Sequence, residues 1–246
     1  MNFYVVIPAR LQSTRLPRKV LLDIAGKPML QHVYERAKQS MAKDVLIATD
    51  SQEIIDVAES FGAKIITTGA HHPSGTDRIA EVVLKNKLAD DDIVINVQGD
   101  EPLLPPELIN LVAERLQLYS DAQVATLAQA FTDAEVYHNP NTVKVVMDSE
   151  HYALYFSRAN IPYFRDSTDV LSHCYKHIGL YAYRAGFIKQ YAGLSKSPLE
   201  QIEQLEQLRV LWHGYKIQVA VTDINTGIGV DTEEDLRRVR EVMGAK

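Results

Sequence analysis

Residues 3–28 read "FYVVIPARLQSTRLPRKVLLDIAGKP" and set the pattern for the first half of the chain. A short run of β-branched and aromatic residues, typical of a buried strand, passes directly into a loop rich in arginine and lysine. Further apolar runs begin at Val45, Ala63 and Ile93, with amphipathic helical stretches between them. This alternation predicts an α/β fold, in which helices flank a mostly parallel, doubly wound central sheet.

The second half has a different rhythm. After about Ala122, longer β-rich segments follow one another, which predicts antiparallel pairs or an arm that extends from the sheet. The stretch "SPLEQIEQLEQLRVLW", residues 197–212, predicts one helix with Ser197 as its N-cap. Its buried stripe is expected to consist of Leu199, Ile202, Leu205 and Leu208. A last helix is expected over residues 232–243, opened by Thr232 with Asp235 three positions on.

Composition limits the classes of function. The chain has 246 residues and a net charge of -6, which argues against a general nucleic-acid surface, since such a surface neutralises many phosphates with cations. Cys174 is the only cysteine, so neither an intrachain disulfide nor a thiolate metal cage is expected. No signal peptide and no apolar run of membrane-spanning length stand out. We therefore expect a cytoplasmic protein without membrane insertion.

The opening basic loop is a candidate phosphate site, because ligands of open α/β sheets bind beyond the carboxyl ends of the strands. Arg10, Arg15, Arg18 and Lys19 could hold the phosphates of a nucleotide. The loop has no glycine before Gly26, so it lacks the Walker pattern, and side chains must do more of the binding. The alternative is a solvated loop that is basic without function.

Two aspartates are candidate metal ligands. Asp100 follows the strand in "VINVQGDEPLLPP" and is a hard oxygen donor of the kind that Mg²⁺ takes, although a simple turn before a helix explains it equally well. Asp231, in "TGIGVDTEEDL", precedes a helix and could be its N-cap, a role for which Thr232 competes. Spacing alone does not show that the two aspartates meet.

Two further groups of polar residues stand out. Ser74, Gly75 and Thr76 offer hydroxyls and a flexible backbone that could read a base edge, and Arg78 could meet a carboxylate or phosphate. In the second half, five polar side chains interrupt apolar segments: Arg158, His177, Glu203, Glu206 and Gln207. They could bind a sugar, and Arg158 could pair with an anionic group of that sugar. The alternatives are the solvated face of an amphipathic helix, favoured for Glu203, and a core position for His177.

Taken together, these segments resemble the 3-deoxy-manno-octulosonate (Kdo) cytidylyltransferases over essentially the whole chain. The motifs that carry the resemblance, in order, are "IPAR", "STRLPRK", "GKPM", "ATD", "SGTDR", "NVQGDEP", "NTVKVV", "YALYFSRANIP", "YKHIGLYAYR", "PLEQIEQLEQLRVL" and "GVDTEEDL". The combination is more specific than any single motif.

The resemblance implies a nucleotide-diphospho-sugar transferase fold and Mg²⁺-dependent transfer of CMP from CTP to Kdo for lipopolysaccharide biosynthesis. It implies a homodimer joined largely through a β-rich arm. It also implies a single domain over residues 1–246, with a nucleotide-binding half at about 1–121 and a sugar-binding and dimerisation half at 122–246.

The resemblance also assigns roles to residues. It places Arg10 and Lys19 on the CTP phosphates, with Arg15 and Arg78 as further members of the nucleotide site, and Ser74, Gly75 and Thr76 at the cytidine. It gives Mg²⁺ to Asp100 and Asp231, which with Arg10 and Lys19 form the expected catalytic group. The expected Kdo pocket consists of Gln98, Arg158, His177, Tyr181, Glu206 and Gln207.

Several points stay open at this stage. Many relatives have glycine where this chain has Arg18. If that position requires positive φ, arginine carries a conformational cost that glycine avoids. Arg18 could instead add a contact to a phosphate. The general base is not identified. The competing functions are a cytidylyltransferase for 8-amino-Kdo or a sialic acid, and a catalytically silent nucleotide-binding regulator.

Overall fold

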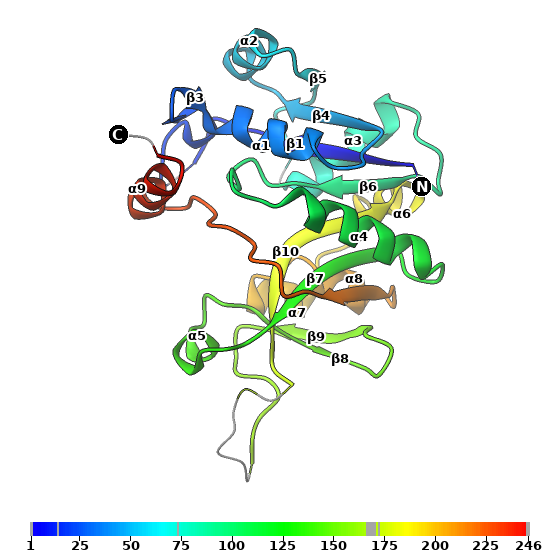
Figure 1. The fold of residues 1–246 in the computed structure, drawn as a ribbon. Coiled ribbons are helices and arrows are strands. Elements are labelled where there is room, and N and C mark those ends of the chain that lie inside the picture. Colours follow the sequence, from blue (N-terminus) through cyan, green and yellow to red (C-terminus); the bar gives the residue numbers. More distant parts are fainter. Residues whose placement is uncertain (1, 14, 73, 166–170, 172, 245–246) are drawn as a thin grey trace. The chain divides into compact units, whose positions relative to one another are not determined.

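The computed structural model describes residues 2–13, 15–72, 74–165, 171 and 173–244 (Figure 1). The chain forms two compact units. The first comprises Met1–Asn110, Arg184–Ala192 and Asn225–Lys246, and the second comprises Leu111–Tyr183 and Gly193–Ile224. The single-domain assignment made from the sequence stays a prediction.

The first unit contains most of the helices. Its elements are β1 (Phe3–Pro8), η1 (Lys19–Leu21), β2 (Asp23–Ile24), β3 (Lys27–Pro28), α1 (Met29–Lys38), β4 (Asp44–Thr49), α2 (Gln52–Ser60), β5 (Lys64–Thr67), α3 (Gly75–Lys85), β6 (Ile93–Asn96), α6 (Ala185–Tyr191) and α9 (Glu233–Val242). Helix α4 (Pro106–Leu118) begins in this unit and ends in the second.

The sheet of the first unit is parallel throughout, in the order β6-β1-β4-β5. Helices α1 and α2 contact β4, whereas α3 contacts β1, β4 and β6 from the other side (Figure 1). The chain thus moves outward from β1 to β5 and then returns to the opposite side of β1. Such a reversal leaves a crevice beyond the carboxyl ends of β1 and β6, where open α/β sheets bind ligands.

The second unit is the β-rich part of the chain. Its elements are β7 (Val124–Ala130), α5 (Ala134–His138), β8 (Lys144–Met147), β9 (Ala153–Ser157), β10 (Tyr175–Arg184), α7 (Pro198–Glu203), α8 (Leu208–Trp212) and β11 (Ile217–Val221). Strand β7 pairs with β11 in parallel and with β10 antiparallel, and antiparallel pairs then join β10 to β8 and β8 to β9.

The predicted fold class is confirmed. The four strands expected in the first half are present as β1, β4, β5 and β6, and the antiparallel pairs expected after Ala122 are present as well. The last helix begins as expected, because Thr232 caps it and the carboxylate of Asp235 accepts a hydrogen bond from the backbone amide of Thr232. Among the described residues, no helix combines the length and apolar character that crossing a lipid bilayer requires.

The prediction of a single helix over residues 197–212 is wrong. The helix stops after Glu203 because Gln204 adopts a left-handed conformation, with φ of 54°, and a separate short helix starts at Leu208. Ile202, expected in the buried stripe, is 78% exposed. Glu203, Glu206 and Gln207 therefore do not share one helix face.

A buried ion pair explains the break. Glu200, in α7, receives hydrogen bonds from the guanidinium of Arg209 in α8, one of them 2.8 Å long from Nε to Oε2, and both side chains are buried. Ser197 caps α7 and forms a reciprocal capping box with Glu200. A continuous helix would hold Glu200 and Arg209 nine residues apart along its axis, so the turn is what allows them to pair.

We predict that Glu200→Gln destabilises the second unit by about 3–5 kcal/mol at pH 7, because it leaves the buried Arg209 charge uncompensated. Burial opposes ionisation of Glu200, but the hydrogen bond and charge of Arg209 outweigh it and lower its pKa below 4.5. This stabilisation is present above pH 4.5 and is lost as the pH falls through the lowered pKa. The difference between variant and parent should therefore shrink in acid.

The measurement is urea unfolding followed by fluorescence of Trp212, the single tryptophan, which lies in the second unit. Glu150→Gln removes an exposed carboxylate of the same unit and serves as the control with no measurable loss expected. A loss for Glu200→Gln that is no larger than that of the control would contradict the prediction.

Candidate functional site

A polar cavity lies at the carboxyl ends of β1 and β6, entirely within the first unit. Its volume is about 670 Å³. The residues that line it are Pro8, Arg10, Gln12, Ser13, Arg15, Lys19, Val20, Gln98, Gly99, Asp100 and Asp231. Six residues singled out from the sequence therefore meet here: Arg10, Arg15, Lys19, Gln98, Asp100 and Asp231.

The two aspartates meet because a backbone hydrogen bond joins their segments. The amide of Val230 donates to the carbonyl oxygen of Asp100 at 2.9 Å, which brings the next residue, Asp231, alongside the turn after β6. Gly227, with φ of 79°, lies against the backbone of Leu103 and allows this close approach. The meeting depends on main-chain geometry that spacing in the sequence does not reveal.

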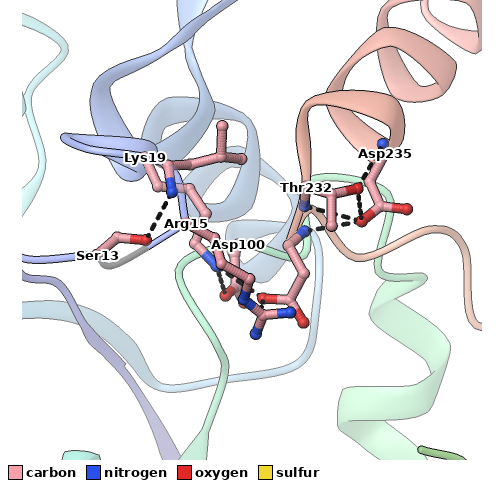
Figure 2. A network of polar contacts seen from close by, with 8 residues as sticks. Ser13, Arg15, Lys19, Asp100, Thr232 and Asp235 are labelled. Carbon is pink, nitrogen blue, oxygen red and sulfur yellow. Dashed lines mark hydrogen bonds and ion pairs between the residues drawn. The ribbon is translucent and has the colours of Figure 1, made fainter.

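Asp231 is not the N-cap of α9. The hydroxyl of Thr232 accepts from the amide of Asp235 at 3.2 Å, and the Asp235 carboxylate accepts from the amides of Thr232 and Asp231 at 2.9 and 3.1 Å (Figure 2). Since Thr232 and Asp235 satisfy the start of the helix, the carboxylate of Asp231 is left to face the cavity. The competing N-cap interpretation of Asp231 is thereby ruled out.

Lys19 contacts both aspartates. Its Nζ is 2.5 Å from Oδ2 of Asp100 and 3.1 Å from Oδ1 of Asp231, and only 12% of its side chain is exposed. Burial alone would lower the pKa of Lys19, but hydrogen bonds to Asp100 and Asp231 and the charges of both carboxylates raise it above 10.5. Lys19 is therefore a cation at neutral pH.

The remaining cations of the loop are more exposed. Arg15 approaches Asp231, with its Nη2 3.4 Å from Oδ1, but 66% of its side chain is exposed, which makes this a weak ion pair. The side chain of Arg10 makes no hydrogen bond or ion pair with any of the described residues. Arg10 and Arg15 are thus placed to meet an anionic ligand with little rearrangement.

Apolar packing fixes the base of this loop. Leu16, 2% exposed, belongs to a core cluster with Ile24 and Met29 from the N-terminal segment and Val230, Leu236 and Val239 from the C-terminal segment. Burial of side chains of this size contributes roughly 1.5–3 kcal/mol each. The basic loop and the segment that carries Asp231 are therefore held together by a shared core as well as by charge.

Arg18 points to another partner. Its backbone is left-handed, with φ of 59° and ψ of 27°, so the conformation that favours glycine is present at this position. Its guanidinium forms an ion pair with Glu53 in α2, and Arg18 is absent from the described lining of the cavity. The proposed phosphate contact of Arg18 gains no support from this placement.

The residues expected at the cytidine lie at the start of α3, beside this cavity. Ser74 caps the helix by accepting from the amide of Asp77 at 3.1 Å, and a Cβ placed on Gly75 would lie 3.6 Å from Pro8, which lines the cavity. Arg78 is buried, and its Nη2 lies 2.7 Å from Oδ1 of Asp50. The described lining does not include residues 74–76 or Arg78.

In the second unit, His177 and Tyr181 lie together on β10, with ring centroids 5.3 Å apart. Burial lowers the pKa of His177 to about 3, so its imidazole is neutral. Oγ1 of Thr126 lies 3.0 Å from Nε2 of His177 and within hydrogen-bond distance of the carbonyl oxygens of Ile178 and Leu180. The neutral imidazole has one nitrogen that donates and one that accepts, so Nδ1 is left for a further hydrogen bond.

The other members of the expected sugar set lie on several elements, and Gln98 lines the cavity of the first unit. Burial raises the pKa of Tyr181 well above 10, and the charge of Glu206 adds to the shift, so Tyr181 keeps its proton. Gln207 is buried at the start of α8. Arg158 follows β9, and its Nε donates to the carbonyl oxygen of Glu203 at 2.8 Å.

Glu203 has a structural role that differs from the solvated position favoured from the sequence. Its carboxylate accepts from the hydroxyl of Ser157 at 2.6 Å and from the amide of Arg158 at 2.9 Å. These contacts fasten the end of β9 to α7.

The chain is closely similar to known cytidylyltransferases. A family model described as Cytidylyltransferase matches residues 4–217. A 3-deoxy-manno-octulosonate cytidylyltransferase from Francisella philomiragia subsp. philomiragia is 56% identical over 247 residues, with 99% of each chain covered. A protein of the same name from Idiomarina loihiensis is 53% identical over 251 residues, again with 99% of each covered.

The chain belongs to the 3-deoxy-manno-octulosonate cytidylyltransferase family.

Solved structures agree with this membership. One described as CMP:2-keto-3-deoxy-manno-octonic acid synthetase complexed with CTP is 44% identical, with a TM-score of 0.91 over 99% of this chain and 98% of that one. The 4-diphosphocytidyl-2C-methyl-D-erythritol synthase from Anaerococcus prevotii, 14% identical with a TM-score of 0.64, shares the fold alone. This family member is therefore a nucleotidyltransferase, as the resemblance predicted.

Sequence reasoning left Glu101 without a role in this cytidylyltransferase. Burial, with the negative charges of Asp100 and Asp231 added to it, raises the pKa of Glu101 to about 7. Its position next to Asp100 in "QGDEP" was the only available signal, and a turn residue explains that position equally well. Gln12 and Ser13, which also line the cavity, carried no signal beyond their place in the basic loop.

We predict that Gly227→Ala destabilises the first unit by about 1–3 kcal/mol more than Gly26→Ala does. Both glycines have positive φ, 79° and 82°, so alanine carries the same backbone cost at either position. A Cβ at Gly227 would lie 2.7 Å from the carbonyl oxygen of Leu103, whereas nothing lies within 4 Å of one at Gly26.

Urea unfolding followed by far-ultraviolet circular dichroism measures the two losses. Equal losses would show that the segment before Asp231 is not held against the turn that carries Asp100.

Proposed function

We propose that this chain transfers CMP from CTP to Kdo, with Mg²⁺, releasing pyrophosphate and forming CMP-Kdo for lipopolysaccharide biosynthesis. The observation that carries the proposal is the paired carboxylates of Asp100 and Asp231 in one cavity with Arg10, Arg15 and Lys19. The names of relatives more than half identical over nearly the whole chain support the choice of CTP and Kdo. We further propose a cytoplasmic homodimer joined through the β-rich part of the second unit.

The donor set fits Mg²⁺. Asp100 and Asp231 offer hard carboxylate oxygens, and Lys19 Nζ lies within hydrogen-bond distance of one oxygen of each. Among the described residues, no group of three or more His, Cys, Asp or Glu side chains is arranged to hold a metal. Two carboxylates suffice for Mg²⁺, because substrate phosphates and water complete its coordination. When bound, Mg²⁺ would supply positive charge against the charge that develops on the phosphates.

The cations of the basic loop have the task of binding and orienting the triphosphate. Arg10 and Arg15 bind phosphate oxygens with their guanidinium groups, and Lys19 adds a point charge. Ser74, Gly75 and Thr76, at the start of α3, face the cytidine, and Arg78 supports that turn through its pair with Asp50. Together these cations would offset the negative charge that develops on the leaving pyrophosphate.

The sugar-binding set offers several groups that pair with hydroxyls. Nδ1 of the neutral His177 and the hydroxyl of Tyr181 can each form a hydrogen bond, while Glu206 and Gln207 offer further oxygen and amide groups. Arg158 provides positive charge for the carboxylate of Kdo, and Gln98 belongs to the same set. Pockets that pair hydroxyls in this way reject analogues that lack them.

In the proposed reaction, the anomeric hydroxyl oxygen of Kdo forms a bond to the α-phosphorus of CTP. The bond from that phosphorus to the oxygen that bridges to the β-phosphate breaks, the hydroxyl proton is lost, and pyrophosphate leaves. Positioning dominates such a transfer, so the arrangement of Arg10, Lys19 and the two aspartates is the protein's main contribution.

The test is release of pyrophosphate from CTP and Mg²⁺ with Kdo, 8-amino-Kdo, a sialic acid or no sugar. We expect release with Kdo. Release only with another acidic sugar would show that the sugar specificity assigned to the sugar-binding set is wrong. No release with any sugar would favour a catalytically silent nucleotide-binding protein.

Variants locate the activity in the cavity. Asp100→Asn and Asp231→Asn should each lower kcat/KM about 100-fold or more, since each removes a charged ligand of the Mg²⁺ that would offset negative charge on the reacting phosphates. Asp91→Asn, at an exposed aspartate outside the cavity, is the matched control and should retain full activity. Arg10→Gln should raise the KM for CTP, whereas Arg18→Gln should not, because Arg18 pairs with Glu53.

A further inference from the structure

The ammonium of Lys19 lies where a cation shared by Asp100 and Asp231 would bind. Its Nζ is 2.5 Å from Oδ2 of one and 3.1 Å from Oδ1 of the other, so it contacts one oxygen of each carboxylate. A divalent cation bound by the same oxygens would lie about 2 Å from each. Two cations cannot occupy these positions together, because they would come close to contact and repel one another.

The backbone of Lys19 is fixed, but its side chain has freedom to move. The amide of Lys19 donates to the carbonyl oxygen of Leu16 at 3.2 Å, and Val20, the next residue, is buried against Gly99. The lysine side chain is a flexible four-carbon stem with three rotatable donors. A new anion in the cavity can therefore redirect Nζ without moving the loop.

We propose that Lys19 closes the metal site of the nucleotide-free chain and opens it when phosphates draw the ammonium away. This inference rests on the proposed function, because it takes Asp100 and Asp231 as the metal ligands. Lys19 is then a positioning residue with two alternative partners, the carboxylates and the triphosphate. Its exchange between them couples metal binding to nucleotide binding, so the free protein binds divalent cations weakly.

The neighbouring cations do not serve the same purpose. Among the residues that the structure describes, Arg15 pairs with Asp231 alone, at 3.4 Å, and its side chain is mostly exposed. Arg18 is turned to Glu53. Removal of the Lys19 charge alone should therefore free both carboxylates for a metal.

The test measures binding of Mn²⁺ to the nucleotide-free chain by electron paramagnetic resonance of the unbound ion. Lys19→Met, which keeps the length of the side chain and removes its charge, should bind Mn²⁺ at least tenfold more tightly than the parent chain. Adding Asp231→Asn to Lys19→Met should abolish the gain. Lys64→Met is the matched control, since Lys64 pairs with a single carboxylate, Asp44, on the same unit.

The outcomes separate the alternatives. An unchanged or weaker affinity in Lys19→Met would overturn the inference, as would an equal gain in Lys64→Met, which would reflect net charge alone. Lys19→Gln carries the same expectation and replaces Lys19→Met if that variant does not fold. A gain in Mn²⁺ affinity without any pyrophosphate release would retain the inference and reject the proposed reaction. Pyrophosphate release without a gain in Mn²⁺ affinity would retain the proposed reaction and reject the inference.

Discussion

Repulsion between two carboxylates is the constraint on which this site depends. The backbone hydrogen bond from Val230 to Asp100 brings Asp100 and Asp231 into one cavity, where their charges oppose one another. Lys19 offsets this repulsion by contacting both. The shared core around Leu16 keeps the lysine loop beside the segment that carries Asp231. Packing and charge therefore act together to hold a site whose charged groups would otherwise separate.

The two units use different polar chemistry. The cavity of the first unit is lined by arginine, lysine and aspartate, whose charges suit phosphates and a divalent cation. The residues of the second unit include a histidine that burial keeps neutral and a tyrosine that keeps its proton, groups that suit the hydroxyls of a sugar. This division matches the two substrates of the proposed transfer, one rich in phosphate and the other in hydroxyl groups.

The sequence predicted those features that depend on local pattern. The parallel sheet, the basic loop after β1 and the acidic turn after β6 followed from apolar runs and from the rule that ligands bind beyond the ends of parallel strands. The meeting of Asp100 with Asp231 did not follow from spacing, because it rests on one long-range backbone contact; only the family resemblance, which assigned Mg²⁺ to both residues, implied it.

The break between α7 and α8 could not be predicted for a related reason. Apolar spacing favoured one long helix, whereas the buried pair of Glu200 and Arg209 requires a turn at Gln204. The partners of Arg18 and Arg78 also come from distant segments.

The most direct test of the central claim is anomalous diffraction from crystals grown with Mn²⁺ and CTP. We predict a manganese peak about 2 Å from oxygens of both Asp100 and Asp231, with Nζ of Lys19 on a phosphate oxygen. A peak elsewhere, with Lys19 still between the two carboxylates, would contradict it.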